Sequence, residues 1–382
     1  MIKSYLLAPG PTPVPERVSL AMARPIIHHR TPQFSATFAD AEAGLKELFQ
    51  TSQDVLILAA SGTGAMESSI TNLYSAGDQI LAINGGKFGE RWGKIGAAYG
   101  LQVHELKVEW GKAVDPQDVR KMLDQHPGIR GVFVQASETS TAVLHPVREI
   151  AAITRERDVL LTVDGITAVG VCDIPMDKWG IDVLITGSQK ALMLPPGLAF
   201  IALSARAWER TKKATLPRFY FNLAKERENI AKDTTAWTPA ITLIIGLREA
   251  LSMMREEGWA NVFTRHALLA EATRAAAAAL GLPLVAPTAP SPALTAIYTP
   301  PHVNGSKLVA YLRDRMHVTF AGGQDQLKGK IVRIAHLGHI GAFDTLTAIS
   351  AFELALHHFG HDVVLGRGVS AAEGVLTAAL PE

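Results

Sequence analysis

Short apolar runs, each ending in small or polar residues, recur through the first half of the chain. Between them lie longer stretches with the spacing of amphipathic helices, for example residues 33–50. Apolar runs without alternation are typical of strands buried on both faces, and helices between them favour a mainly parallel sheet with βαβ connections. The pattern therefore predicts an α/β fold, with strands at residues 54–60, 79–83, 131–135, 159–163 and 183–187.

The pattern changes near both ends of the chain. Residues 8–15 contain four prolines, which remove backbone donors and fix φ, so this segment is expected to form an extended arm. A proline-rich link at 283–292 precedes two strand-like segments, 318–323 and 329–338. No regular pattern is evident after about residue 361. We therefore predict three parts: an N-terminal arm (1–20), a large domain (21–282) and a small C-terminal α+β domain (283–382).

Length and composition are consistent with this division. A chain of 382 residues exceeds the usual size of a single core, and 48% of its residues are apolar. The formal charge is +1, so neither nucleic acid nor an anionic membrane is favoured as a partner. The single cysteine, Cys172, excludes an internal disulfide, and the N-terminal residues lack the apolar region of a signal peptide. We expect a cytoplasmic protein that acts on a small molecule.

The most informative residues follow two of the predicted strands. The strand at 159–163 ends in Asp164, and the strand at 183–187 is followed by Lys190. A partly buried lysine can lose its proton near neutral pH and attack a carbonyl group, although most lysines in loops are ordinary surface residues. The nearby aspartate alters this expectation, because pyridoxal 5'-phosphate (PLP) requires a lysine for its aldehyde and an acid beside its pyridine nitrogen. We interpret Lys190 and Asp164 as catalytic residues of a PLP enzyme.

A phosphate site is predicted upstream of this pair. Ser61, Gly62 and Thr63 lie between the strand at 54–60 and the start of a helix. This order brings free backbone N–H groups and the positive end of the helix dipole to one place. The spacing differs from a Walker motif and by itself could mark a simple helix cap. In combination with Lys190 and Asp164, it is expected to hold the PLP phosphate.

These motifs resemble those of the class V aminotransferases of PLP fold-type I, and most of all the alanine-glyoxylate and serine-glyoxylate aminotransferase group. The resemblance extends from about residue 5 to about residue 360. It rests on the Asp164 strand and on Gly187-Ser188-Gln189-Lys190-Ala191 followed by Pro195-Pro196-Gly197. It implies a seven-stranded, mainly parallel sheet, a homodimer with an active site shared between subunits, and a cofactor contact at Gln189.

The resemblance assigns further residues to the cofactor. Phe88, which has glycines nearby on both sides, would project from a loop and stack on the pyridine ring, with a core position as the alternative. Thr139 would offer its hydroxyl near the phenolic oxygen and also contact the substrate. Thr235 and Thr238 would reach the phosphate held by the partner subunit. Thr238 could equally cap a helix that has Pro239 at its first position.

Two more positions are expected at the substrate. Arg333 stands alone in an apolar segment, where an unpaired guanidinium would be costly, so it should face an anion. In the resembled family, the arginine of this Val-Arg-Ile motif binds the substrate carboxylate through two hydrogen bonds, and a structural ion pair is the alternative. Gly10 would border the mouth of the active site, or belong to a plain N-terminal arm.

The expected activity is ping-pong transamination, in which the amino group of a small amino acid passes to glyoxylate or pyruvate. Alanine and serine are the expected donors. The chain departs from the family pattern at Ala136, Ser137 and Ala142, so the donor cannot be carried over from the resemblance. Aspartate-glyoxylate and ureidoglycine-glyoxylate aminotransferases are therefore alternatives.

Two other classes of protein are alternatives. A PLP lyase or cysteine desulfurase shares the fold, but a desulfurase needs a reactive thiol, and Cys172 lies in an apolar segment where it is expected to be inert. A non-catalytic scaffold would be expected to have lost Lys190, Asp164 or Arg333, and all three are present. We expect no metal site, because the adjacent His28 and His29 point to different sides.

Overall fold

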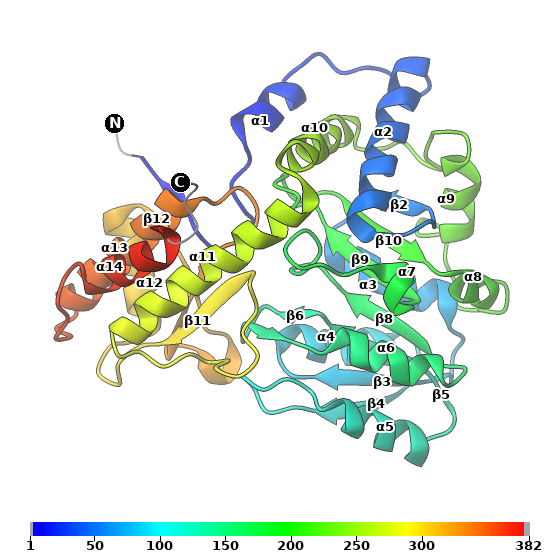
Figure 1. Ribbon diagram of the computed structural model, residues 1–382. Coiled ribbons are helices and arrows are strands. Elements are labelled where there is room, and N and C mark those ends of the chain that lie inside the picture. Colours follow the sequence, from blue (N-terminus) through cyan, green and yellow to red (C-terminus); the bar gives the residue numbers. More distant parts are fainter. Residues whose placement is uncertain (1–2, 378–382) are drawn as a thin grey trace.

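The computed structural model describes residues 3–377, and its largest sheet contains seven strands in the order β2-β10-β9-β8-β5-β3-β4 (Figure 1). β10 runs antiparallel to β2 and β9, and the other neighbouring pairs are parallel. The prediction of a mainly parallel, seven-stranded sheet is therefore confirmed. The strands are β2 (Val55–Leu58), β3 (Gln79–Asn84), β4 (Gln102–Lys107), β5 (Ile129–Gln135), β8 (Leu160–Asp164), β9 (Val183–Gly187) and β10 (Ala199–Leu203).

Helices cover both faces of this sheet, which explains why its central strands are apolar without alternation. Every residue of β2, β8, β9 and β10 is buried. One face packs against α2 (Pro32–Phe49), α5 (Pro116–Gln125), α6 (Val147–Arg155), α7 (Met176–Trp179) and α10 (Ile241–Glu257). The other face packs against α3 (Gly62–Leu73), α4 (Lys87–Ala98) and α8 (Ala205–Thr211).

A second hydrophobic cluster lies beside the large sheet and is built around the three-stranded antiparallel sheet β11-β14-β13. The cluster also contains Leu7 and residues from Leu269 onward, so the predicted domain boundary at residue 283 stays a prediction. Its elements are α11 (Trp259–Ala279), β11 (Leu294–Tyr298), α12 (Gly305–Met316), β13 (Ala321–Gly322), β14 (Ile331–Ala335), α13 (Ala342–His358) and α14 (Arg367–Thr377).

The remaining elements are short. β1 (Tyr5–Leu6) pairs in parallel with β12 (Val318–Thr319), and β6 (Ser137–Glu138) pairs with β7 (Val143–Leu144). α1 (Glu16–Met22) packs on α10, α9 (Leu223–Ile230) lies near β2, and a 3₁₀ turn spans Asp325–Leu327. Within residues 3–377, no helix combines the length and the apolar character needed to cross a bilayer.

The last helix within residues 3–377, α14, is held by a contact that the sequence pattern does not reveal. Glu353 on α13 is buried and accepts hydrogen bonds from the N–H groups of Gly366 (2.7 Å) and Gly368 (2.5 Å). A carboxylate at a helix N-terminus satisfies donors that have no partner within the helix. Glu353 therefore anchors the start of α14, which packs against α11 and α13.

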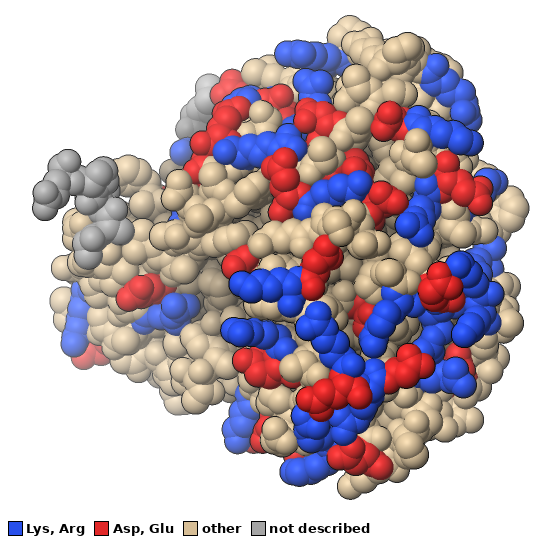
Figure 2. Space-filling model, turned by 45° about the vertical axis from the view of Figure 1, so that its right-hand side comes forward, with Lys and Arg blue, Asp and Glu red and all other residues tan. Residues whose placement is uncertain are grey.

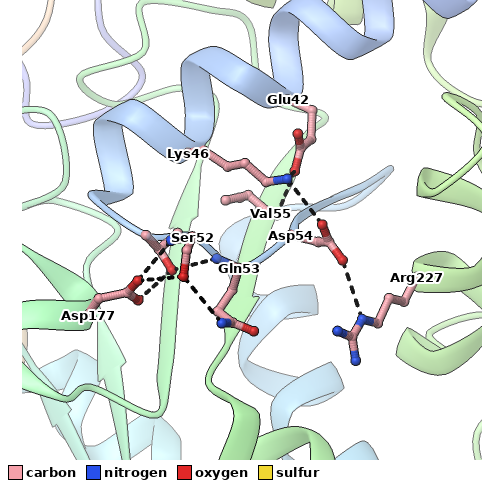
Figure 3. A network of polar contacts seen from close by, with 9 residues as sticks. Glu42, Lys46, Ser52, Gln53, Asp54, Val55, Asp177 and Arg227 are labelled. Atoms are coloured by element: carbon pink, nitrogen blue, oxygen red, sulfur yellow. Dashed lines mark hydrogen bonds and ion pairs between the residues drawn. The ribbon is translucent and has the colours of Figure 1, made fainter.

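A network of ion pairs and hydrogen bonds stabilises the segment between α2 and β2 (Figure 3). β2 is the strand that leads to residues 61–63. Lys46 forms ion pairs with Glu42 (2.9 Å) and Asp54 (3.1 Å), and Arg227 also pairs with Asp54 (3.3 Å). Glu42 accepts in addition from the N–H of Val55 at 3.2 Å. Two helices distant in sequence, α2 and α9, thus fix the first residues of β2.

Figure 2 shows a face on which basic and acidic side chains are interleaved rather than segregated. Such a surface lacks the single-sign field with which a protein attracts nucleic acid. This agrees with the near-zero formal charge of the sequence.

The buried histidines predict how stability depends on pH. Burial lowers the pKa of His336 from the ordinary 6.5 to about 3, and its Nε2 lies 2.8 Å from the Thr295 hydroxyl. Between these two pKa values the unfolded chain binds more protons, so acidification from pH 6.5 to 5 destabilises the fold. Urea unfolding should therefore show a loss on acidification that is smaller by about 1–2 kcal/mol in a His336→Gln variant than in the parent.

Buried carboxyl groups with raised pKa values, such as Asp164, are stabilised by acidification. Because they are present in both the parent and the His336→Gln variant, their effect cancels when the two losses of stability are compared. Replacing the exposed His302 by glutamine is the matched control for the loss of an imidazole side chain. Equal losses in the parent and the His336→Gln variant would show that His336 is not held neutral.

Candidate active site

A cavity of ≈ 120 Å³ opens at the carboxyl ends of the parallel strands. Eight of the residues predicted to contact the cofactor line it together: Ser61, Gly62, Thr63, Phe88, Thr139, Asp164, Gln189 and Lys190. Four further lining residues were not identified from the sequence: Arg91, Ser137, Ile166 and Thr167. Because β8 and β9 are parallel neighbours, the residues that follow them meet at the same edge of the sheet.

Lys190 follows β9 and enters the cavity from its rim. Its Nζ donates to the carbonyl oxygen of Pro9 in the N-terminal arm. Burial, together with the charge of Arg333, lowers the pKa of Lys190 to about 8. About a tenth of this amine is therefore uncharged at pH 7, far more than for an ordinary lysine, and the uncharged form is the one that attacks a carbonyl group.

Asp164 ends β8 with its side chain almost fully buried. One carboxylate oxygen accepts from the N–H of Ile166 at 2.9 Å, and burial raises the pKa of Asp164 to about 7. Within residues 3–377, no lysine or arginine forms an ion pair with it. A buried carboxylate without a cationic partner is suited to a ligand that carries a protonated nitrogen.

The start of α3 forms another wall of the cavity. Ser61 is the N-cap residue, but its side chain makes no capping hydrogen bond, so the simple cap considered from the sequence does not describe this hydroxyl. A Cβ added at Gly62 would lie 2.9 Å from Cγ1 of Ile166, which explains the glycine there. The hydroxyl of Thr63 accepts from Nη1 of Arg91 at 2.9 Å. A helix N-terminus with a nearby guanidinium suits a phosphate group.

Phe88 lines the cavity and is only partly buried, so the alternative of a core position is wrong. The expectation of a projecting loop is also wrong, because Phe88 lies in the first turn of α4. The buried carboxylate of Glu138 accepts from the N–H groups of Phe88 (3.1 Å) and Gly89 (3.0 Å). These bonds satisfy helix donors that otherwise lack partners, which extends the helix to Lys87.

Thr139 and Arg333 are joined at the far side of the cavity. The Thr139 hydroxyl lies 2.6 Å from the Thr167 hydroxyl. The backbone carbonyl oxygen of Thr139 accepts a hydrogen bond from Nη1 of Arg333 at 2.8 Å. Nε of Arg333 donates to the carbonyl oxygen of Gly322 at 2.9 Å. Arg333 is 6% exposed, and burial lowers its pKa to about 10.

No carboxylate within residues 3–377 pairs with Arg333, so the alternative of a structural ion pair is not supported there. Its Nη2 makes no hydrogen bond to any of these residues. Arg333 does not line the cavity itself but approaches it through Thr139. The guanidinium is thus held by two carbonyl groups with one donor group still free for an anion.

Thr235 and Thr238 are not brought to this cavity. They line a separate small hollow with Tyr220 and Trp237, and the Thr235 hydroxyl donates to the carbonyl oxygen of Trp237 at 2.6 Å. The N-cap of α10 is Ala240, so the alternative of helix capping at Thr238 is wrong. Their predicted role toward a partner subunit stays a prediction.

Gly10 lies against the side chain of Lys190. Its φ is +137°, and an added Cβ would lie 2.7 Å from Cε of Lys190. A residue with a side chain would therefore be strained and would displace Lys190. This places Gly10 at the edge of the site, while a direct substrate contact stays a prediction.

Comparison with known proteins agrees with this geometry. The family model described as "Aminotransferase class-V" matches residues 4–334. The chain is 46% identical to "Soluble hydrogenase, small subunit" of Synechococcus sp. (strain PCC 6716), over 99% of both chains. It is 36% identical to L-aspartate--glyoxylate aminotransferase of Paracoccus denitrificans, over 96% of this chain and 95% of that one.

Among solved structures, ureidoglycine-glyoxylate aminotransferase from Bacillus subtilis matches with a TM-score of 0.94 and 27% identity, over 99% of both chains. Serine--glyoxylate aminotransferases are also among the relatives, so the resemblance described from the sequence is confirmed. The chain belongs to the class V aminotransferase family.

Proposed function

We propose that this protein is a PLP-dependent transaminase that passes the amino group of a small amino acid to glyoxylate or pyruvate. The observation that carries the proposal is the meeting of Lys190 and Asp164 in one cavity with the N-terminus of α3. PLP requires an amine for its aldehyde, an acid for its pyridine nitrogen and donors for its phosphate. These residues fit all three requirements.

The bound cofactor would supply an aldehyde and an electron-withdrawing ring. Asp164 would hold the ring nitrogen protonated, and residues 61–63 with Arg91 would hold the phosphate. Lys190 would take the α-proton of the amino acid, which its lowered pKa favours, because an uncharged amine is a proton acceptor. Arg333 would bind the substrate carboxylate and so fix which bond to the α-carbon faces Lys190.

The relatives support a glyoxylate acceptor but not one donor. Their names include serine, aspartate and ureidoglycine donors. Aspartate and ureidoglycine are therefore retained as alternative donors to alanine and serine. The lining residue Ser137 lies where the chain departs from the family pattern, and its hydroxyl contacts that of Ser291 at 2.7 Å.

Two other activities are less well supported. Hydrogenase clusters of iron and sulfur are held by several cysteine thiolates, and this chain contains one cysteine. A desulfurase needs a thiolate, whereas burial raises the pKa of the Cys172 thiol to about 12. The chain's own residues therefore favour transamination over both.

We further infer a homodimer in the cytoplasm. The hollow that contains Thr235 and Thr238 is bordered by Tyr220, and Phe219 beside it is 79% exposed. Large exposed aromatic side chains are characteristic of protein interfaces. Light scattering of the purified protein should give the mass of two chains, and a monomer that is fully active would contradict a shared active site.

The proposed location in the cytoplasm rests on the single cysteine, which is compatible with a reducing compartment.

A substrate panel tests the function. Alanine, serine and aspartate should each be offered to the purified holoprotein while the cofactor absorbance is followed. At least one should convert the cofactor to its amine form, and glyoxylate or pyruvate should restore the original spectrum. The absence of any spectral change with all three donors would contradict the proposal.

The role of Arg333 gives a separate prediction. Lysine at this position keeps the charge but lacks the planar fork that lets Arg333 donate to two carbonyl groups and still present Nη2 to an anion. Arg333→Lys should weaken binding of amino acid and keto acid by about 1.5–3 kcal/mol, while the cofactor spectrum stays as in the parent. Spectral titration with the best donor and with glyoxylate measures both affinities.

Arg210→Lys is the matched control, because Arg210 is largely buried but lies near the amino ends of the strands, away from the cavity. It should leave both affinities unchanged. Unchanged affinities in Arg333→Lys as well would mean that the carboxylate site lies elsewhere.

A further inference from the structure

The first residues of the N-terminal arm form a two-stranded sheet with β12. β1 pairs with β12, and the N–H of Leu7 donates to the carbonyl oxygen of Thr319 at 2.9 Å. The carbonyl oxygen of Leu7 accepts from the N–H of Ala335 at 2.9 Å. Ala335 ends β14, the strand that carries Arg333. The arm is therefore attached to the strand of the predicted carboxylate site.

A few residues later, the same arm is attached to the backbone of the catalytic lysine. The N–H of Thr12 donates to the carbonyl oxygen of Gln189 at 3.1 Å, and the Thr12 hydroxyl donates to that of Lys190 at 2.8 Å. Thr12 is 2% exposed, so neither bond competes with bulk water. The carbonyl oxygen of Pro9 also accepts from Nζ of Lys190.

The chain beyond β14 closes on the same point. A Cβ added at Gly338 would lie 3.0 Å from the Thr12 hydroxyl oxygen and 3.1 Å from the carbonyl oxygen of Lys190. Gly338 has a φ of +83°, and its carbonyl oxygen accepts from Nη1 of Arg265 at 3.0 Å. Thr12 is thus enclosed between the loop of Lys190 and the loop that follows Arg333.

We infer that residues 7–12, here called the arm clamp, fix Lys190 relative to Arg333, and that Thr12 is a positioning residue for proton transfer by Lys190. The inference rests on the proposed function. Lys190 follows β9 of the seven-stranded sheet, and Arg333 lies on β14 of the three-stranded sheet. The arm clamp is hydrogen-bonded to Ala335 at the end of β14 and to the backbone of Gln189 and Lys190. A small displacement between a base and the bond it acts on lowers the rate strongly, by up to about 100-fold for 1 Å.

The Thr12 hydroxyl can be removed without leaving a buried acceptor unpaired. The carbonyl oxygen of Lys190 also accepts from the N–H of Met193 at 3.0 Å. Thr12→Val preserves the shape of the side chain and removes only the donor, and Thr12→Ser keeps the donor. Thr37→Val is the matched control, since Thr37 is 6% exposed and donates to the carbonyl oxygen of Gln33 at 3.0 Å on α2.

The first measurement is amide hydrogen exchange of the purified holoprotein, which does not depend on turnover. Loss of one hydrogen bond shifts a local opening equilibrium by up to about tenfold. In Thr12→Val, exchange should become faster by about this factor in the peptides that cover residues 8–14 and 188–194. Thr12→Ser and Thr37→Val should exchange like the parent in these peptides.

The second measurement is the single-turnover rate with the best donor of the panel of alanine, serine and aspartate, with hydrogen or deuterium at its α-carbon. Thr12→Val should react about tenfold more slowly and show a larger isotope effect, because proton transfer becomes more strongly rate-limiting. Affinity for the donor should stay within about twofold of the parent, and Thr12→Ser should recover the parent's rate.

Parent-like exchange in Thr12→Val overturns the arm clamp, and so does faster exchange with an unchanged rate and isotope effect. A lower rate that Thr12→Ser does not recover also overturns it. Failure of the proposed function is distinguishable, because then the parent itself gives no spectral change with any donor. In that case the exchange data alone decide whether the arm holds the Lys190 segment.

Discussion

Replacement of Lys190 by alanine is expected to lower the rate of amino transfer by at least about 10³-fold, the largest effect of any single substitution in the chain. The variant would lose both roles proposed for Lys190, the amine that would hold the cofactor and the base that would move the α-proton. The fold should persist, because Nζ of Lys190 contributes to the protein a bond to the Pro9 carbonyl and little else. Single-turnover rates followed at the cofactor absorbance measure the loss.

Adding a small amine to the Lys190→Ala variant separates the loss of the proton acceptor from the loss of the covalent bond to the cofactor. A small amine such as methylamine can replace the missing proton acceptor in solution, so it should restore part of the rate in proportion to its concentration. Lys178→Ala, on the exposed side of α7, is the control and should react like the parent. A Lys190→Ala variant that retained more than about a tenth of the parent rate would show that another residue moves the proton.

Asp164→Asn is expected to slow the same half-reaction by at least about 100-fold while the cofactor stays bound. Asparagine fills the same space and can still accept from the N–H of Ile166, so the geometry of the strand end is preserved. It cannot keep the ring nitrogen protonated by a negative charge. The ring then withdraws electrons less strongly from the carbon that loses its proton.

The control for this variant is Asp182→Asn, which also removes a buried carboxylate but at the other end of the sheet. Asp182 pairs with Arg206, so its replacement should lower stability and leave the single-turnover rate unchanged. If Asp164→Asn reacted within a factor of about ten of the parent, equivalent to ~1.4 kcal/mol of barrier, the role assigned to Asp164 would be wrong.

The sequence was informative wherever function depended on the ends of strands. Uninterrupted apolar runs indicate strands buried on both faces, and in a parallel sheet their carboxyl ends must meet. The sequence pattern alone therefore predicts that Asp164, Lys190 and Ser61 lie close together. In the structure, all three residues line one cavity.

Residues that act through tertiary contacts were missed. Arg91 follows Phe88 by one helical turn, a spacing that puts both on one face, but the helix itself was interpreted as a loop. That error has a physical cause, since the buried carboxylate of Glu138 extends α4 to Lys87 from a distant strand. Thr12 was equally hidden, because its partner Lys190 lies far away in the chain.

The substrate donor is the other part that local patterns do not determine. The lining of the cavity combines residues from many separate segments, so its shape depends on packing rather than on any one motif. The direct contact between Ser137 and Ser291 joins a strand end to the link before β11. Changes at either residue would alter the cavity without changing a recognisable motif.

The central claim is that Lys190 is the residue that binds PLP. The most direct test is reduction of the purified protein with borohydride, followed by proteolysis and mass spectrometry of the labelled peptide. We expect the reduced pyridoxyl group on Lys190, in the peptide that begins after Arg157 or Lys178 and contains Gly187-Ser188-Gln189. A label on any other lysine, or no label on protein saturated with PLP, would contradict the account.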